Sequence, residues 1–240
     1  MSAPPPLPPL PSPPSSSSVA SEAVAAKSVA GVRGGGAPPL DAQQRAVVAA
    51  VLERHENVFM TGTAGAGKSF TLRTLVAEAR AAGLVVEVTS TTGRSAVELD
   101  LGATTLHSLF GIGKGEKSAA SYARDLHKPR MRAYLERLRA LDVLVVDEIS
   151  MAPAEVLEKV ETILADVRNA PTVPWGGAQV VFSGDFFQLL PVPDTSPAAK
   201  RKRGGGGRPE RPALAFEAPR AWGASAVHVY VGTCRPQTPG

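Results

Sequence analysis

Residues 62–69 read Gly62-Thr63-Ala64-Gly65-Ala66-Gly67-Lys68-Ser69, which is the spacing G-x-x-x-x-G-K-S. They lie between a predicted strand, 57–62, and a predicted helix, 68–82. Glycines let consecutive backbone N–H groups face a phosphate, and the N-terminus of the following helix adds positive potential. Lys68 is placed to reach the β- and γ-phosphates and Ser69 to hold Mg²⁺. A glycine-rich turn with a surface lysine is the alternative, but the flanking strand and helix favour a phosphate-binding loop.

In the segments on either side of this loop, the spacing of apolar residues alternates between that of strands and that of helices. Short apolar runs predict strands, and amphipathic runs between them predict helices. The predicted strands are 57–62, 84–90, 143–147, 179–184 and 227–231. The predicted helices are one that follows Asp41 as N-cap and carries Val47, Val48, Val51 and Leu52 at helical spacing, and the segments 68–82, 93–101, 129–141 and 154–167. Nearly continuous apolar strands separated by helices are typical of a parallel sheet covered on both faces. The expected fold class is therefore doubly wound α/β.

The composition sets the limits of the folded part. Residues 1–39 hold ten of the 22 prolines, a four-serine run and a glycine run, so we expect a disordered tail; a transit peptide is the alternative. Residues 195–212 carry a lysine- and arginine-rich run followed by four glycines, and we expect a basic disordered insertion. The single cysteine, Cys234, excludes a disulfide-stapled domain. No apolar stretch is long enough to span a bilayer, so we expect no membrane partner.

An acidic pair follows the predicted strand 143–147. Asp147 and Glu148 come after four apolar residues, at the carboxyl end where ligands of open α/β sheets bind. Asp147 is suited to hold Mg²⁺ and Glu148 to polarise an attacking water. Taken alone, such a pair is more often a helix cap with a solvated neighbour. Because it follows a phosphate-binding loop in the same strand pattern, we interpret it as catalytic.

The strand 179–184 ends in Gly184-Asp185-Phe186-Phe187-Gln188-Leu189. A glutamine at the end of a neighbouring strand can touch the γ-phosphate and report its presence, which gives Gln188 a sensor role. The alternative is a turn with two core phenylalanines, Phe186 and Phe187.

Taken together, these three stretches resemble the superfamily-one DNA helicases of the Pif (petite integration frequency) type. Three further stretches agree with this resemblance. They are Leu40-Asp41-Ala42-Gln43-Gln44, residues 89–96 continuing into 105–111, and Ala215-Phe216-Glu217 followed by Trp222. The resemblance implies a P-loop NTPase fold, a RecA-like first motor domain over residues 40–231. It also implies an ATP-dependent DNA helicase that unwinds 5'-to-3' and uses ATP and Mg²⁺.

The resemblance also implies a role for each site residue. The catalytic residues are Lys68, Glu148 and Gln188; the nucleotide-binding residues are Gln44, Gly62, Thr63, Ala64, Gly65, Ala66, Gly67, Lys68 and Ser69; the metal ligands are Ser69 and Asp147; the DNA-binding residues are Thr92, Gly93 and His107. Gln44 would read the adenine base. His107, judged without the resemblance, is more readily a satisfied core or helix-cap histidine.

The resemblance further implies partners and limits. We expect single-stranded DNA and DNA junctions as partners, nuclear localisation with the mitochondrion as alternative, and roles in DNA repair, recombination and telomere maintenance. A second RecA-like domain normally supplies arginines to the transferring phosphate. Residues 232–240 are expected to be a tail without that domain, so full activity would need it or a partner chain. The alternatives are a truncated module that binds nucleotide or single-stranded DNA without turnover, and a small-molecule kinase.

Overall fold

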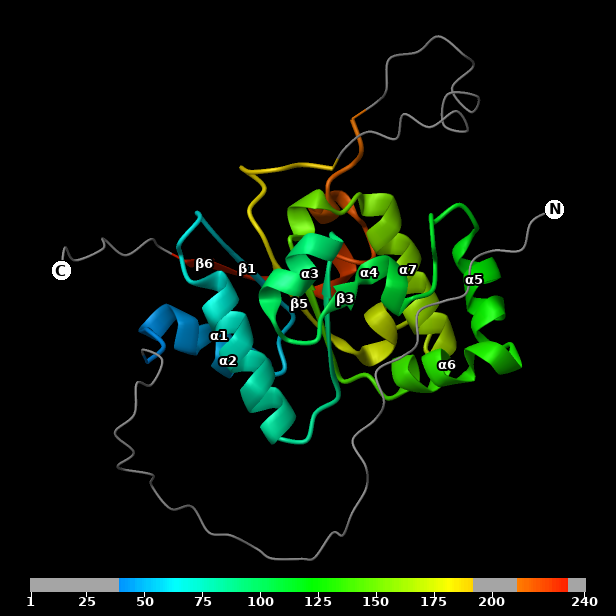
Figure 1. Ribbon diagram of the computed structural model, residues 1–240, viewed down its shortest axis with the longest axis horizontal. Coiled ribbons are helices and arrows are strands. Elements are labelled where there is room, and N and C mark those ends of the chain that lie inside the picture. The colour runs from blue at the N-terminus through cyan, green and yellow to red at the C-terminus, as the bar shows by residue number, and fades with distance from the viewer. Residues whose placement is uncertain (1–38, 192–210, 233–240) are drawn as a thin grey trace, which may run out of the picture. The chain divides into compact units, whose positions relative to one another are not determined.

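The computed structural model describes residues 39–191 and 211–232, and Figure 1 shows the arrangement of their elements. The expectations for the N-terminal tail, for most of the basic insertion and for residues 233–240 lie outside this part. The strands form one sheet in the order β3-β2-β4-β5-β1-β6, and every pair is parallel. The strands are β1 (Val58–Gly62), β2 (Val86–Ser90), β3 (Thr104–Thr105), β4 (Val143–Asp147), β5 (Gln179–Ser183) and β6 (His228–Gly232).

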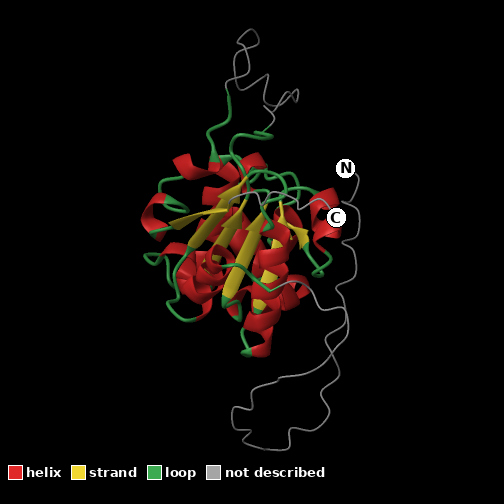
Figure 2. Ribbon diagram, turned by 90° about the vertical axis from the view of Figure 1, so that its left-hand side faces the viewer, coloured by secondary structure: helices red, strands yellow, loops and turns green. Residues whose placement is uncertain are grey.

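Helices connect the strands and lie on both sides of the sheet (Figure 2). The α-helices are α1 (Ala42–Leu52), α2 (Lys68–Ala81), α3 (Gly93–Leu99), α4 (Leu106–Leu109), α5 (Ala119–Leu126), α6 (Arg132–Arg139) and α7 (Ala154–Val167). The 3-10 turns are η1 (Pro129–Met131), η2 (Ile149–Met151), η3 (Pro174–Gly177), η4 (Ala215–Glu217) and η5 (Gly223–Ser225). Across the described ranges, 39–191 and 211–232, none of the helices combines the length and apolar character needed to cross a bilayer. The predicted doubly wound α/β fold is confirmed.

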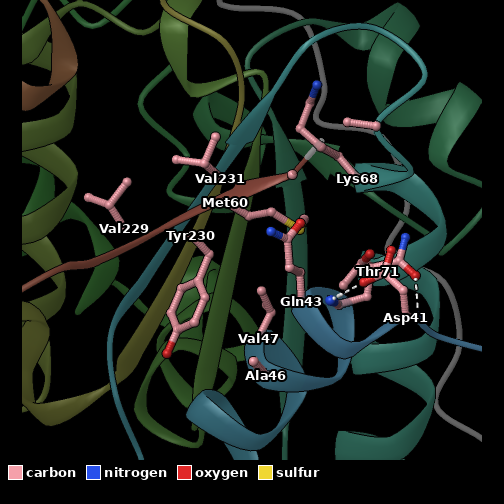
Figure 3. Close-up of a pocket in the computed structure, with 13 residues that line it drawn as sticks. Asp41, Gln43, Ala46, Val47, Met60, Lys68, Thr71, Val229, Tyr230 and Val231 are labelled. Atoms are coloured by element: carbon pink, nitrogen blue, oxygen red, sulfur yellow. Dashed lines mark hydrogen bonds between the residues drawn. The ribbon is translucent and has the colours of Figure 1, made fainter. Parts of the chain in front are cut away.

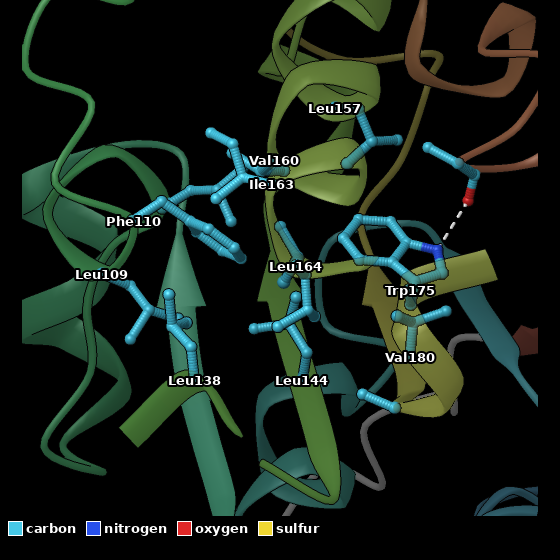
Figure 4. Packing of buried hydrophobic residues seen from close by; sticks show 14 of the residues in the cluster. Leu109, Phe110, Leu138, Leu144, Leu157, Val160, Ile163, Leu164, Trp175 and Val180 are labelled. Carbon is cyan, nitrogen blue, oxygen red and sulfur yellow. Dashed lines mark hydrogen bonds between the residues drawn. The ribbon is translucent and has the colours of Figure 1, made fainter. Parts of the chain in front are cut away.

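Alternate residues of the central strands enter two separate cores. On β4, Leu144 and Val146 pack with the helices α4 to α7, whereas Val143 and Val145 pack with α1 and α2. This alternation follows from the two-residue period of a strand. Figure 4 shows the first core, where Leu144 lies among side chains of α4, α6 and α7 and beside Trp175. Burial on both faces explains why these strands are almost wholly apolar.

The segment 213–225 is held against α7 by two of that helix's carboxylates. Glu158 accepts hydrogen bonds from the backbone N–H groups of Arg220, at 2.7 Å, and Ala221, at 2.8 Å. Glu161 is fully buried and accepts from the Arg220 guanidinium, at 2.7 Å, and from the backbone N–H of Trp175, at 3.0 Å. The ring of Trp222 stacks on Phe182 of β5, with centroids 5.0 Å apart. These contacts hold the segment 213–225 on the core.

The structure differs from the sequence expectations in one helix, one strand end and three unpredicted elements. The predicted helix 129–141 is divided into η1 and α6, because Met131 has non-helical backbone angles (φ −103°, ψ 5°) at the junction. The two-residue strand β3, which has no apolar run, and the short helices α4 and α5 were not predicted. The last strand ends at Gly232 rather than at residue 231, because Gly232 pairs with Gly62 of β1. The other predicted strands and helices agree within two residues.

Candidate functional site

Three neighbouring strands end in the predicted functional segments. The sheet order puts β5 between β4 and β1, and all three strands are parallel. The glycine-rich loop therefore follows β1, the acidic pair closes β4 and the Gln188 turn follows β5, all at one carboxyl edge. The structure brings these three stretches together, although more than a hundred residues separate the first from the last.

The loop 62–69 turns directly into α2. Gly67 caps this helix in the left-handed conformation (φ 80°), where a side chain would be strained and its Cβ would lie 2.5 Å from the Gln44 amide nitrogen. The Lys68 ammonium donates to the carbonyl oxygens of Gly62, at 2.6 Å, and Thr63, at 3.2 Å. Ser69 is exposed in the first turn of α2. The lysine thus lies across the loop, within reach of any phosphate that the loop binds.

A cavity of about 300 Å³ opens beside the loop, between α1, β1, α2 and β6 (Figure 3). Gln44 lies on its wall and completes a capping box: its Oε1 accepts from the Asp41 N–H, at 3.0 Å, and its own N–H donates to Asp41, at 2.8 Å. This bond orients the amide so that its NH₂ group lies against Gly67. Tyr230 of β6 lines the same cavity, and its hydroxyl is held by Arg54, at 2.9 Å.

Tyr230 was not singled out from the sequence as a site residue. The predicted strand 227–231 contained it, but only the pairing of β6 with β1 places it next to α1. The cavity volume is at the lower end of the range for small-ligand sites. Lys68 and residues of α1 and β6 line it together, so it lies directly beside the glycine-rich loop.

The acidic pair lies in a partly dehydrated environment. Asp147 is buried, and burial raises the pKa of its carboxyl. Burial also raises the pKa of the Glu148 carboxyl, with a further contribution from the negative charge of Asp147. The Lys68 charge opposes both shifts and also acts on Asp185, so the lysine is electrostatically coupled to all three acids. A carboxyl with a raised pKa is a better proton acceptor once ionised, as a water-activating base requires.

Glu148 adopts the left-handed backbone conformation (φ 53°, ψ 39°), which is uncommon for residues other than glycine. Its neighbours on both sides constrain this turn. On the β5 side, a Cβ at Gly184 would lie 3.0 Å from the Ile149 nitrogen, so only glycine allows the close approach. On the β2 side, the Thr91 hydroxyl donates to the Glu148 carbonyl, at 3.1 Å. The unusual conformation is therefore fixed by contacts from two adjacent strands.

Gln188 is exposed and is oriented by Asp185. The Asp185 carboxylate accepts from the Phe187 N–H, at 3.0 Å, and from the Gln188 amide, at 2.8 Å. The Phe187 N–H, more than any other group, lowers the pKa of Asp185. Phe186 packs against the core, with Phe59 at 5.5 Å between ring centroids, but Phe187 is fully exposed, so only one of the two phenylalanines is a core residue.

Besides Tyr230, the residues Asp185 and Thr91 contact this site but were named in the sequence analysis only within longer stretches. Asp185 was quoted only as part of the stretch 184–189. The signal that could have identified it is the spacing Asp-x-x-Gln in a turn, in which an aspartate commonly accepts from the backbone N–H two residues later. Thr91 has no comparable local signal, because its partner is 57 residues away.

The available oxygen ligands fit Mg²⁺ bound together with phosphates. In the described residues no three His, Cys, Asp or Glu side chains form a metal cluster. Mg²⁺ commonly uses one or two protein oxygens, substrate phosphates and water rather than a cage made wholly of protein. A buried carboxylate at Asp147 and an exposed hydroxyl at Ser69, on neighbouring parts of the edge, match that pattern.

The predicted DNA-binding residues lie on the other side of β4, after β2 and β3. Thr92 caps α3 by accepting from the Ser95 N–H, at 3.2 Å, and Gly93 is exposed at the first position of that helix. His107 is half-buried in α4, and burial, helped by the Lys159 charge, lowers its pKa. A neutral imidazole would contact DNA by hydrogen bonding or stacking rather than by charge. Because β2 and β3 are paired, these residues share the carboxyl edge.

Residues 39–203 match the family described as PIF1-like helicase. The chain belongs to the PIF1-like helicase family. It is similar to the "ATP-dependent DNA helicase PIF1" of Emericella nidulans, with 37% identity over 160 residues, which is 65% of this chain and 21% of that protein. The chain thus spans only about a fifth of the length of this PIF1 relative.

Two solved Pif1 structures are similar to the fold. The Pif1 helicase of Candida albicans superposes with a TM-score of 0.69 and 31% identity, covering 82% of this chain and 40% of that one. The Pif1 helicase from Bacteroides in complex with ADP-AlF3 and ssDNA superposes with a TM-score of 0.63 and 29% identity, covering 82% of this chain and 42% of that one. The six-stranded parallel sheet is therefore that of the PIF1-like helicases.

Proposed function

We propose that this chain is the first motor domain of an ATP-dependent DNA helicase, binding MgATP at the carboxyl edge of β1, β4 and β5. The observation that carries the proposal is the convergence of Lys68, the Asp147–Glu148 pair and Gln188 at that edge. A structural turn would have no need for two partly dehydrated carboxyls and a lysine in electrostatic contact. Perturbed carboxyls in such a position are typical of functional sites.

Each side chain has a distinct role in the proposal. The loop N–H groups and Lys68 bind the phosphates, so the ammonium leaves the carbonyls of Gly62 and Thr63 for the nucleotide. Ser69 and Asp147 hold Mg²⁺, which neutralises charge on the phosphates when bound. Glu148 orients and polarises the attacking water. Gln188, held by Asp185, contacts the γ-phosphate.

The base and the DNA strand have separate places in the proposal. The adenine enters the cavity of about 300 Å³, where the Gln44 NH₂ group can donate to a ring nitrogen and Tyr230 offers an aromatic surface. Single-stranded DNA lies along Thr92, Gly93 and His107. The Bacteroides relative in complex with ADP-AlF3 and ssDNA supports the use of both ligands.

Unwinding needs more than this domain. Charge on the transferring phosphate is commonly neutralised by arginines from a second domain, worth about 10³ to 10⁵ in rate in P-loop enzymes. The proposal therefore includes a second motor domain or partner chain for 5'-to-3' unwinding of DNA junctions. Roles in repair, recombination and telomere maintenance, and a nuclear rather than mitochondrial location, are parts of the same proposal.

The test is steady-state ATP hydrolysis by the purified chain with Mg²⁺, with and without oligo-dT. Because the arginines of a second domain normally accelerate the step, we expect only slow turnover by the chain alone. DNA should raise this rate, Lys68→Ala should abolish it, and Lys114→Ala, at an exposed lysine outside the site, should preserve it. Turnover equal to that of Lys68→Ala, with nucleotide binding retained, would instead favour a module that binds without hydrolysis. Loss of both binding and turnover would overturn the proposal.

A further inference from the structure

Thr91 joins the end of β2 to the catalytic turn after β4. Its hydroxyl donates to the Glu148 carbonyl, at 3.1 Å, and its N–H donates to the Asp147 carbonyl, at 3.3 Å. One residue therefore holds the main chain of both acids. The next residue along the chain is Thr92, the cap of α3.

The contact matters because Glu148 is in an unfavourable backbone conformation. A left-handed conformation at a residue other than glycine is strained and persists only when its surroundings hold it. The Glu148 carbonyl accepts two hydrogen bonds, from the Thr91 hydroxyl and from the Met151 N–H, at 3.0 Å. The second belongs to the local turn η2. Only the Thr91 bond ties this carbonyl to a different strand.

Two other hydroxyls of β2 make comparable bonds but do not reach Glu148. Thr89 donates to the Val145 carbonyl, at 2.8 Å, and Ser90 to the Asp147 carbonyl, at 3.4 Å. Thr89 is fully buried in the middle of the sheet, whereas Thr91 is partly exposed at its edge. Thr91 alone of the three contacts the residue proposed to activate water and adjoins the segment proposed to bind DNA.

We propose that Thr91 is a positioning residue, through which DNA bound at Thr92 and Gly93 sets the orientation of the Glu148 carboxylate. The inference rests on the proposed function and adds a physical connection between its two binding sites. DNA at the start of α3 restrains the Thr92 backbone, and the peptide link to Thr91 passes that restraint to the Glu148 carbonyl. The effect falls on the hydrolysis step rather than on nucleotide affinity, because Thr91 does not line the nucleotide cavity.

The experiment measures single-turnover ATP hydrolysis by the 240-residue chain at saturating Mg²⁺, with and without oligo-dT. Binding of a fluorescent ATP analogue is measured in parallel. The variants are Thr91→Val, which removes the hydroxyl and keeps the shape, and Thr91→Ser, which restores the hydroxyl. Thr89→Val is the matched control, since it removes a hydroxyl that joins the same two strands.

A net hydrogen bond of about 0.5–1.5 kcal/mol corresponds to roughly 2- to 13-fold in rate. We expect Thr91→Val to lower the DNA-stimulated rate by about that factor with analogue affinity unchanged, and Thr91→Ser and Thr89→Val to behave as the wild type. The inference is overturned if Thr91→Val retains full stimulation, if Thr91→Ser is equally defective, if Thr89→Val is equally defective, or if DNA does not accelerate the wild type. Failure of the proposed function gives a different result, because the analogue then fails to bind or binds equally to Lys68→Ala.

Discussion

Two buried carboxyls on neighbouring elements of this domain differ in how they are satisfied. Glu161 of α7 is fully buried, and it is bonded to the Arg220 guanidinium and the Trp175 N–H. Asp147 of β4 is also buried but has no ion pair among the described residues, and burial raises its pKa. The first carboxyl holds two parts of the fold together. The second pays a desolvation penalty without an ion pair, and we expect it to be retained for the proposed Mg²⁺ site.

The difference between Glu161 and Asp147 suggests a criterion for separating carboxyls that stabilise the fold from carboxyls that serve binding or chemistry. A buried charge with a full set of partners stabilises the arrangement that provides them, whereas one without a cation partner lowers stability and is retained for binding or chemistry. Glu148 is only half-buried, but its pKa is also raised by burial and by Asp147, so we expect it to resemble the second kind.

The largest effect is expected on hydrolysis at Glu148. Glu148→Gln keeps the size of the side chain but removes its ability to accept a proton. The hydrolysis rate should fall by about 10²- to 10⁴-fold, the usual contribution of a general base, with ATP-analogue affinity retained. Single-turnover hydrolysis per folded molecule checks this, and Glu161→Gln should leave that rate unchanged. A rate for Glu148→Gln within a few-fold of wild type would remove Glu148 from the catalytic role.

The second largest effect is expected on stability at Glu161. Glu161→Ala leaves the buried backbone N–H of Trp175 without its acceptor, and an unsatisfied buried donor costs about 1–3 kcal/mol. It also removes the partner of the Arg220 guanidinium, whose side chain is 35% exposed. Urea unfolding of wild type and variant measures the difference in free energy. Glu155→Ala on the same helix is the control, because that side chain is 87% exposed. Equal midpoints for Glu161→Ala and Glu155→Ala would show that the buried network is not stabilising.

Removing the charge of Asp147 is expected to raise the free energy of unfolding, whereas removing that of Glu161 is expected to lower it. Its raised pKa means that the folded state binds a proton more readily than the unfolded state. The charged carboxylate therefore lowers stability at neutral pH, and this penalty disappears as the pH falls through the raised pKa. Asp147→Asn should increase the unfolding free energy at neutral pH without Mg²⁺, and the gain should vanish in acid. Urea unfolding at several pH values checks this, and a loss of stability at neutral pH would contradict it.

The smallest effect is expected at an exposed ion pair. Arg94 and Glu98 lie one turn apart on α3, 2.8 Å from each other, with side chains that are 89% and 63% exposed. Solvent and salt screen such pairs. Arg94→Ala should leave the urea midpoint within error of the wild type, in contrast to Glu161→Ala. A large loss of stability would mean that solvent exposure does not explain the difference between the Arg94–Glu98 pair and the Arg220–Glu161 pair.

Much of the fold could be predicted because its central elements have strong local patterns. Residues 143–147 and 154–167 were predicted with the observed bounds, since one is a continuous apolar run before an acidic pair and the other an amphipathic run. The helices α4 and α5 and the strand β3 were missed. They are short and depend on packing: Leu106, Tyr122 and Leu126 are buried only because α7 and the sheet lie against them.

The residues of the candidate site likewise fall into those that local patterns predict and those that depend on long-range contacts. Lys68, Asp147, Glu148 and Gln188 could be proposed from spacing, because their chemistry depends on residue type at the ends of strands. Tyr230 depends on the pairing of β6 with β1, and Thr91 on a hydrogen bond across 57 residues. Sequence patterns do not reveal such long-range contacts. The roles of the predicted site residues stay predictions until the variants are measured.

The most direct test of the account is urea unfolding of the wild type and Lys68→Ala, each with and without MgATP. A ligand at 100 times its dissociation constant stabilises the folded state by about 2.7 kcal/mol. We expect MgATP to raise the unfolding free energy of the wild type and to leave Lys68→Ala nearly unchanged. No stabilisation of the wild type, or an equal stabilisation of both proteins, would contradict a nucleotide site at the carboxyl edge of β1, β4 and β5.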